Sequence, residues 1–431
     1  MASWASLFWT DYRPISKFIN HITDFRNHNY RFRDLAECLH SRQVIRSENM
    51  KQTILTIAAI LTASPVLAEP VALHKWTTLK WAEDAPSAPA DIGTRAPLAG
   101  VEGGPDGTIF VSVPRWIDAQ VPATINRVDA DGLLHPWPNA ATHNLSDPKA
   151  IRNGLGGFID SQGRYWILDL GWVAGEDAAP EGGQKLLAYD VKTGKELVRY
   201  EIGPDVANPA TSFLNDLHVD EQTGTIFITD SGNRGGSPVP AGLIVYDIET
   251  NTARRVLHNH PSVQDDPDRR LVVDGVEVFP DQRLAVGTNG ITRAGDRIWW
   301  SITTGDALYS VPEALLRDPN VTEIELAAAV EGPLRIGGGS DGLAADEKGR
   351  LWITNLALNR VEVLEPGADE TGILFEGGDF VWPDSLASDF AGGILLSTNR
   401  LNSAFTGKLA YDGDDANFAI WRIPADLAPT R

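Results

Sequence analysis

The stretch that decides the fold is Arg350-Leu351-Trp352-Ile353-Thr354, a short alternating β segment with a large apolar residue at its centre. Ser or Thr stands two positions after the central residue in five of six such copies. The other five copies occupy residues 108–112, 164–168, 225–229, 297–301 and 393–397. One pattern recurring along the whole chain indicates a structural repeat.

The spacing of the copies predicts what one repeat contains. The central residues are Phe110, Trp166, Phe227, Trp299, Trp352 and Leu395, and they lie 43 to 72 positions apart. A second β run follows each copy, at residues 125–129, 186–190, 243–247, 308–312, 361–364 and 420–424. Units of four strands with variable loops fit these lengths, so we expect an all-β fold, a six-bladed β-propeller. Helical periodicity is weak outside residues 313–317, which argues against an α/β barrel.

The N-terminal region carries an export signal within the chain. Met50-Lys51 precedes an apolar run at 53–62 and small residues at 63–68, as in a secretory signal peptide. We therefore expect residues 1–49 to be a non-native upstream extension, 50–68 a signal peptide and 69–431 a single propeller domain. A genuine cytoplasmic extension or an internal membrane anchor is the alternative. Export predicts a periplasmic or extracellular protein without membrane attachment after signal cleavage.

Charge and cysteine content limit the classes of partner and chemistry. The formal net charge is −21, from 58 acidic and 37 basic side chains, so nucleic acid is not expected as a partner. This charge would favour a cationic ligand, but an acidic solvated surface that keeps a secreted protein soluble is the simpler explanation. The single cysteine, Cys38, lies before residue 69, so the expected mature chain contains no disulfide, cysteine nucleophile or thiolate metal site.

Several motifs carry a family resemblance. Val113-Pro114-Arg115-Trp116, followed by residues 121–126 and 136–138, resembles the first-blade signature of the major royal jelly protein/Yellow family. Further matching stretches are 163–169, 213–217, 242–247, 340–344 and 382–386, so the resemblance spans about residues 95 to 424 in order.

The resemblance implies a six-bladed propeller and secretion, but it leaves the activity open. Members of that family are described as dopachrome-converting isomerases, as salivary binders of biogenic amines, and as food or structural proteins, so one fold carries several functions. The chain differs from many such relatives because residues 69–431 contain no cysteine.

Polar residues recur before the central residue of each repeat, where the innermost strand of a blade would begin. Asn215, Asn289, Asp341 and Asp384 lie 10 to 12 positions before it, whereas Glu102 and Asn153 lie at offsets of 8 and 13. We expect these six residues to form a ring at one mouth of the central channel. The other interpretation is that Asn-Gly and Asp-Gly pairs merely form the turn that enters the strand.

Such a ring suits two kinds of ligand. Hard oxygen atoms from Glu102, Asn153, Asn215 and Asp341 are ligands for a divalent cation such as Ca²⁺, which is the one cofactor considered. Carboxylates and amides at Asn215, Asn289, Asp341 and Asp384 equally suit an ammonium group. The aromatic residues Trp382 and Phe213, with Trp116 nearby, would stack on an aromatic ligand.

His218 follows Asn215 by three residues and is the acid/base candidate by residue type. The alternative is that it is a histidine of the protein core.

Three functions remain open, and so does the question of whether the protein is an enzyme. The first is a secreted binder of a small aromatic or amine ligand, with dopachrome tautomerase-like isomerase activity. The second is a metal-dependent lactonase or esterase of the gluconolactonase-like propeller type. The third is a non-catalytic interaction propeller.

Overall fold

The computed structural model describes residues 69–431 except 236–237, 414, 425 and 428–431. These residues belong to the compact unit Ala68–Arg431. The expected extension at 1–49 and the signal peptide at 50–68 lie outside the described residues. Within the described ranges, no helix has the length and apolar character needed to cross a membrane.

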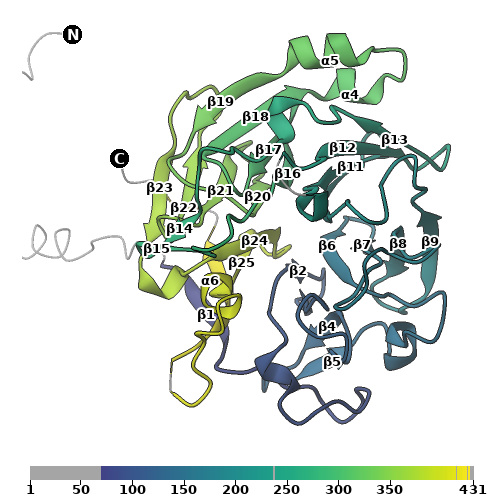
Figure 1. Cartoon of the computed structure of the whole chain (residues 1–431), viewed down its shortest axis with the longest axis vertical. Helices are drawn as coiled ribbons and strands as arrows, with labels where there is room; N and C mark the ends of the chain where they lie inside the picture. The colour runs from purple at the N-terminus through teal and green to yellow at the C-terminus, as the bar shows by residue number, and fades with distance from the viewer. Residues whose placement is uncertain (1–68, 236–237, 414, 425, 428–431) are drawn as a thin grey trace, which may run out of the picture. The chain divides into compact units, whose positions relative to one another are not determined.

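The described unit is a six-bladed β-propeller, as the repeats predict. Six four-stranded antiparallel sheets form the ring in Figure 1, and in the first five blades the strands follow chain order from the centre outward. The innermost strands are β2 (Val101–Gly103), β6 (Gly154–Ile159), β10 (Leu214–Asp220), β16 (Thr288–Ala294), β20 (Leu343–Ala345) and β24 (Pro383–Ser388). Each innermost strand contacts the next, and β24 contacts β2, so the ring of inner strands is closed.

The six repeat copies form the second strands. These are β3 (Ile109–Ser112), β7 (Arg164–Asp169), β11 (Thr225–Asp230), β17 (Arg297–Ile302), β21 (Leu351–Asn355) and β25 (Gly393–Thr398). The second β runs form the third strands β4 (Ile125–Val128), β8 (Lys185–Asp190), β12 (Gly242–Asp247), β18 (Ala307–Pro312), β22 (Arg360–Leu364) and β26 (Phe418–Pro424). Of the six central residues, all but Trp299 are buried, and in that blade the neighbouring Trp300 is buried.

The outer strands complete the blades, and one of them closes the ring. They are β5 (Leu134–Pro136), β9 (Glu196–Glu201), β13 (Thr252–Val256), β19 (Glu331–Arg335), β23 (Gly372–Glu376) and, in the sixth blade, β1 (Val71–Trp76). β1 pairs with β26, so the purple N-terminal strand lies in the same sheet as the yellow C-terminal strands in Figure 1. This pairing holds the two ends of the ring together and leaves no open blade.

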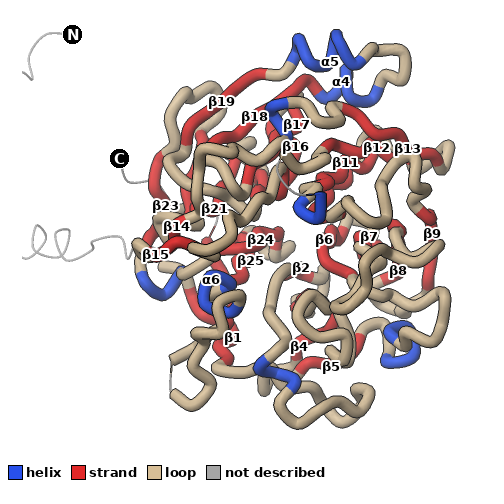
Figure 2. The backbone as a smooth tube through the Cα atoms, in the orientation of Figure 1, coloured by secondary structure: helices blue, strands red, loops and turns tan. Residues whose placement is uncertain are grey.

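The described part of the chain contains few helices. They are α4 (Glu313–Arg317), α5 (Glu323–Ala329) and α6 (Leu401–Ala404), with 3-10 turns η1 (Ile92–Thr94), η2 (Ala140–His143), η3 (Asn233–Gly235), η4 (Pro261–Val263) and η5 (Gly378–Phe380). Figure 2 shows α4 and α5 at the outer edge of the ring. A short hairpin, β14 (Val272–Val273) with β15 (Val276–Glu277), belongs to the insertion before β16.

Three of the Ser and Thr residues of the repeat, Thr229, Ser301 and Ser397, donate to a carbonyl of the neighbouring blade. Thr229 Oγ1 donates to the carbonyl of Asn289 in the next blade at 2.6 Å. Ser397 Oγ donates to the carbonyl of Ala99 at 2.6 Å across the seam between the sixth and first blades, and it accepts from the Ser385 amide of its own blade at 3.0 Å. The repeated hydroxyl is therefore a buried hydrogen-bonding group at the level where the inner strands begin.

Candidate functional site

The strand register identifies which residues lie at the same height in the channel. The central residues of the second strands pair with Glu102, Phe158, His218, Thr292, Ala344 and Ala387 on the inner strands. Three positions before each of these lie Ala99, Leu155, Asn215, Asn289, Asp341 and Asp384. All six of those earlier residues line one cavity of about 230 Å³, which we call the mouth pocket.

This register corrects the expected ring in two blades. Ala99 and Leu155 take the places expected for Glu102 and Asn153, while Asn215, Asn289, Asp341 and Asp384 lie together as expected. Asn153 is fully buried beside the pocket, where its Oδ1 accepts from the Arg115 amide and its Nδ2 donates to the Trp172 carbonyl. Ala99 and Leu155 lie 11 positions before their central residues, as Asp341 and Asp384 do, whereas Glu102 and Asn153 lie 8 and 13 positions before them.

The glycines after the ring residues have a packing role. A Cβ at Gly290 would lie 2.6 Å from the Asp341 carbonyl oxygen, and one at Gly342 would lie 2.1 Å from that of Asp384. Neither glycine has a positive φ, and Asn289 and Gly290 lie within β16. These glycines are needed because neighbouring inner strands approach closely, so the turn-only interpretation of Asn289 and Asp341 does not hold.

Asp341 is the most thoroughly hydrogen-bonded residue of the ring. Its Oδ1 accepts from Asn289 Nδ2 at 2.7 Å and from Thr303 Oγ1 at 3.0 Å. Its Oδ2 accepts from Trp382 Nε1 at 2.7 Å. Burial raises the pKa of Asp341 to about 6, although these three donors act in the opposite direction.

Asp384 lies in the neighbouring blade and is held by a single side-chain donor, Asn399 Nδ2, at 2.5 Å. Burial raises its pKa well above the ordinary value, and the negative charges of Asp341 and Asp216 raise it further. Two carboxylates that repel each other in one buried cavity gain stability when a cation lies between them.

Aromatic side chains form another part of the wall of the mouth pocket. Phe213 precedes Asn215, and its ring lies 5.7 Å from Trp116 and 5.8 Å from Trp172 between centroids. All three line the pocket with Leu155, as does Trp382. Phe213 and Trp382 were expected at the site, whereas Trp172, Phe279 and Phe405 carry no repeat signal and come from loops.

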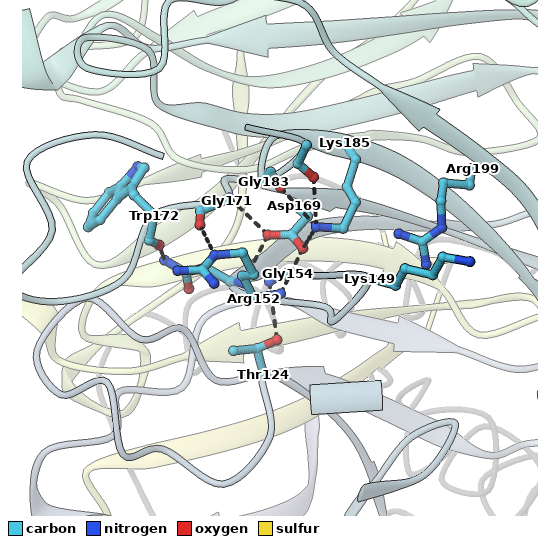
Figure 3. A network of polar contacts seen from close by, with 12 residues as sticks. Thr124, Lys149, Arg152, Gly154, Asp169, Gly171, Trp172, Gly183, Lys185 and Arg199 are labelled. Carbon is cyan, nitrogen blue, oxygen red and sulfur yellow. Dashed lines mark hydrogen bonds and ion pairs between the residues drawn. The ribbon is translucent and has the colours of Figure 1, made fainter. Parts of the chain in front are cut away.

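Buried carboxylates at the ends of two second strands position the loops that lead into the site. Asp230 accepts from the Phe213 amide at 2.8 Å and from Ser212 Oγ at 2.5 Å. Its counterpart Asp169 accepts from the amides of Arg152 and Asn153 and pairs with Lys185 Nζ at 2.9 Å, as Figure 3 shows. Each aspartate therefore fixes the position of the residues that directly precede the inner strand of its own blade.

A second cavity, of about 540 Å³, contains the remaining candidates, and we call it the far cavity. Glu102 and His218 line it together with Asp216, Phe158 and Thr292. Burial lowers the pKa of His218 to about 4, so its imidazole is neutral at pH 7. Burial raises the pKa of Glu102 well above its ordinary value and that of Asp216 to about 7. Asp341 and Asp384 line the mouth pocket and not the far cavity, so His218 lies away from this pair.

The arrangement of possible ligands at the site does not favour a metal ion. In the part of the chain that the structure describes, no group of three or more His, Cys, Asp or Glu side chains is arranged to hold one. Asp341 already accepts three hydrogen bonds, of about four that a carboxylate accepts. Of the proposed metal ligands, Asn215 and Asp341 share the mouth pocket, while Glu102 lines the far cavity.

Comparison with known families gives one match that covers most of the chain. The family model described as Major royal jelly protein matches residues 158–430. Major royal jelly protein 3 of Apis mellifera is 27% identical over 225 residues, which cover 50% of this chain and 39% of that protein. Major royal jelly protein 1 of Apis mellifera is 28% identical over 218 residues, covering 47% of each chain. The matched stretch thus spans less than half the length of these relatives.

Solved propellers resemble the chain less closely. A putative gluconolactonase is 16% identical with a TM-score of 0.49, covering 86% of this chain and 97% of its own. A gluconolactonase from Xanthomonas campestris is 14% identical with a TM-score of 0.46, covering 85% and 92%. Similarity at this level carries no information on chemistry.

Proposed function

Because the chain belongs to the major royal jelly protein family, we propose that it is an exported propeller which binds a small organic cation with an aromatic group in the mouth pocket. One observation carries the proposal: Asp341 and Asp384 line the same cavity, of about 230 Å³, as several aromatic side chains. Family membership alone does not select a ligand, since one fold serves several functions.

The charge of the site supports a cation. Asp341 and Asp384 lie in adjacent blades, and the charge of Asp341 raises the pKa of Asp384. A bound ammonium group would offset this repulsion and donate hydrogen bonds to the carboxylate oxygens.

The hydrogen bonds around Asp341 favour an organic cation over a bare metal ion. Asn289 directs its amide nitrogen toward Asp341, so its Nδ2 acts as a donor there. A metal ion needs several free oxygen lone pairs, whereas an ammonium group can donate hydrogen bonds to the few that Asp341 still has free. The lactonase or esterase alternative, which requires the metal, is correspondingly less well supported.

The aromatic wall supports a ligand with a ring. The ring of Phe213 contacts those of Trp116 and Trp172, and all three residues line the cavity that contains the carboxylates. A ring-bearing amine would gain both stacking and cation–π attraction. Because His218 lines the far cavity, the geometry supports binding at the mouth rather than acid/base isomerisation there.

Calorimetric titration of the protein with dopamine, serotonin and Ca²⁺ tests the proposal. Asp341→Asn should weaken amine binding by about 1–3 kcal/mol, the loss expected for a charge-assisted hydrogen bond. Asp369→Asn, an equal change of charge at an exposed position, should leave binding unchanged. Binding of Ca²⁺ alone, with loss in Asp341→Asn, would favour the lactonase alternative, and absence of all binding would refute the proposal.

A further inference from the structure

The mouth pocket is bounded by two insertions as well as by the blades. Phe279 and Leu284 come from the segment between β13 and β16, which also contains the β14–β15 hairpin. Leu401 and Phe405 come from the segment that follows β25 and contains α6. These segments lie more than a hundred residues apart, and neither belongs to the repeat.

The two insertions meet through one aromatic pair. The rings of Phe279 and Phe405 are stacked, with centroids 5.5 Å apart and an interplanar angle of 26°. Phe405 also meets Trp382 edge-on at 6.2 Å and 82°. Trp382 Nε1 in turn donates to Asp341 Oδ2. The side chain of Trp382 therefore connects the Phe279–Phe405 pair to the carboxylate of Asp341.

Two of these aromatic residues have a strained backbone. Phe279 has φ 55° and Trp382 has φ 52°, the left-handed region that bulky residues rarely adopt. Strain of this kind persists where the surrounding structure imposes it, and such residues cluster at ligand sites. Here both strained residues line the same cavity.

We propose that Phe279 and Phe405 are specificity-determining residues that form an aromatic clamp on the ring of the bound ligand. The ligand class is then a planar aromatic ring joined to an ammonium group, with the ring against the clamp and the ammonium at Asp341 and Asp384. This inference rests on the proposed function, because it assigns a role to residues of the same pocket.

Two amines of equal charge and similar size distinguish a clamp from a merely apolar wall. 2-Phenylethylamine has a flat ring, whereas 2-cyclohexylethylamine has a puckered one that cannot stack. Wild type should prefer the phenyl compound, and Phe405→Ala, Phe405→Leu and Phe279→Gly should each reduce that preference by about 2- to 10-fold, the range for an aromatic pair. Affinity for the cyclohexyl compound should change less than the affinity for the phenyl compound.

The variants include their own controls. Phe405→Leu keeps the apolar volume, so a loss of preference there reports the ring rather than packing. Phe390→Gly is matched to Phe279→Gly because Phe390 also has φ 55° but lies exposed in the β24–β25 loop. It should leave the preference unchanged.

The outcomes separate the two proposals. If wild type binds both amines and the preference survives Phe405→Leu and Phe279→Gly, the clamp is refuted while the binding function stands. If wild type binds neither amine, the proposed function fails and the clamp fails with it. Loss of the preference in both variants, with Phe390→Gly unchanged, supports the clamp.

Discussion

Asn289 Nδ2 donates a 2.7 Å hydrogen bond to Asp341 Oδ1 across the boundary between the fourth and fifth blades. The two residues lie at the same register position of neighbouring inner strands. Thr303 contacts both of them, at 2.8 Å to Asn289 Nδ2 and 3.0 Å to Asp341 Oδ1. The carboxylate is therefore oriented before a ligand arrives, which lowers the ordering cost of binding.

Amine binding at the mouth pocket should depend on pH through Asp341. Its pKa is raised to about 6 by burial, and a cation binds the ionised form. The affinity for an amine that stays protonated should therefore fall by about tenfold per pH unit once the pH drops below that pKa. Titration calorimetry from pH 5 to pH 8 measures this. An Asp341→Asn variant should lose the part of the slope due to Asp341, and an identical profile in both proteins would contradict the assignment.

Asp216→Asn should stabilise the protein at alkaline pH. Burial raises the pKa of Asp216 from 3.8 to about 7, so between these values the folded state holds a proton that the unfolded state releases. The contribution of Asp216 to the free energy of unfolding therefore falls as the pH rises from about 4 to 7, and stays low above that.

The variant should accordingly exceed wild type by about 1–3 kcal/mol at pH 8 and match it near pH 4. Urea unfolding at the two pH values provides the comparison. A difference of the same size at both would show that titration of Asp216 is not its cause.

Ser397→Ala should destabilise the seam where the ring closes. The hydroxyl accepts from the partly buried Ser385 amide and donates to the buried Ala99 carbonyl, and removing it leaves both groups without this partner. The expected cost is about 1–3 kcal/mol. Ser161→Ala, which removes an exposed hydroxyl bonded to Glu221, should cost less than about 0.5 kcal/mol. Equal effects in thermal unfolding would argue against the seam role.

The buried pair of Asp169 and Lys185 should show strong non-additivity. Both side chains are fully buried, and their charged atoms lie 2.9 Å apart (Figure 3). Asp169→Asn leaves the Lys185 charge unpaired in the interior, at a cost of about 3–5 kcal/mol. The double variant with Lys185→Met should be less destabilised than the sum of the two single variants, by about 0.5–3 kcal/mol in a urea double-mutant cycle. Additive costs would mean that the pair is not coupled.

Part of the candidate site was predictable because it belongs to the repeat. Asn215, Asn289, Asp341 and Asp384 recur at nearly constant offsets from the central residues, so they were expected together and the structure brings them together. Ala99 and Leu155 share the offset of 11 found for Asp341 and Asp384, but apolar side chains gave no chemical signal. Glu102 was wrongly expected in the ring because it was chosen for its carboxylate and not for its offset from the central residue.

The sequence by itself determined the six blades and the two middle strands of each blade. Alternation of apolar residues and recurrence of the pattern are local properties, and six self-similar sheets can bury their faces and edges only in a closed ring. The tertiary structure alone decided the seam of β1 with β26, the separation of His218 from Asp341, and the meeting of Phe279 with Phe405. Each of these depends on residues far apart in the chain, and their proximity follows from how bulges and insertions set the height of each strand in the ring.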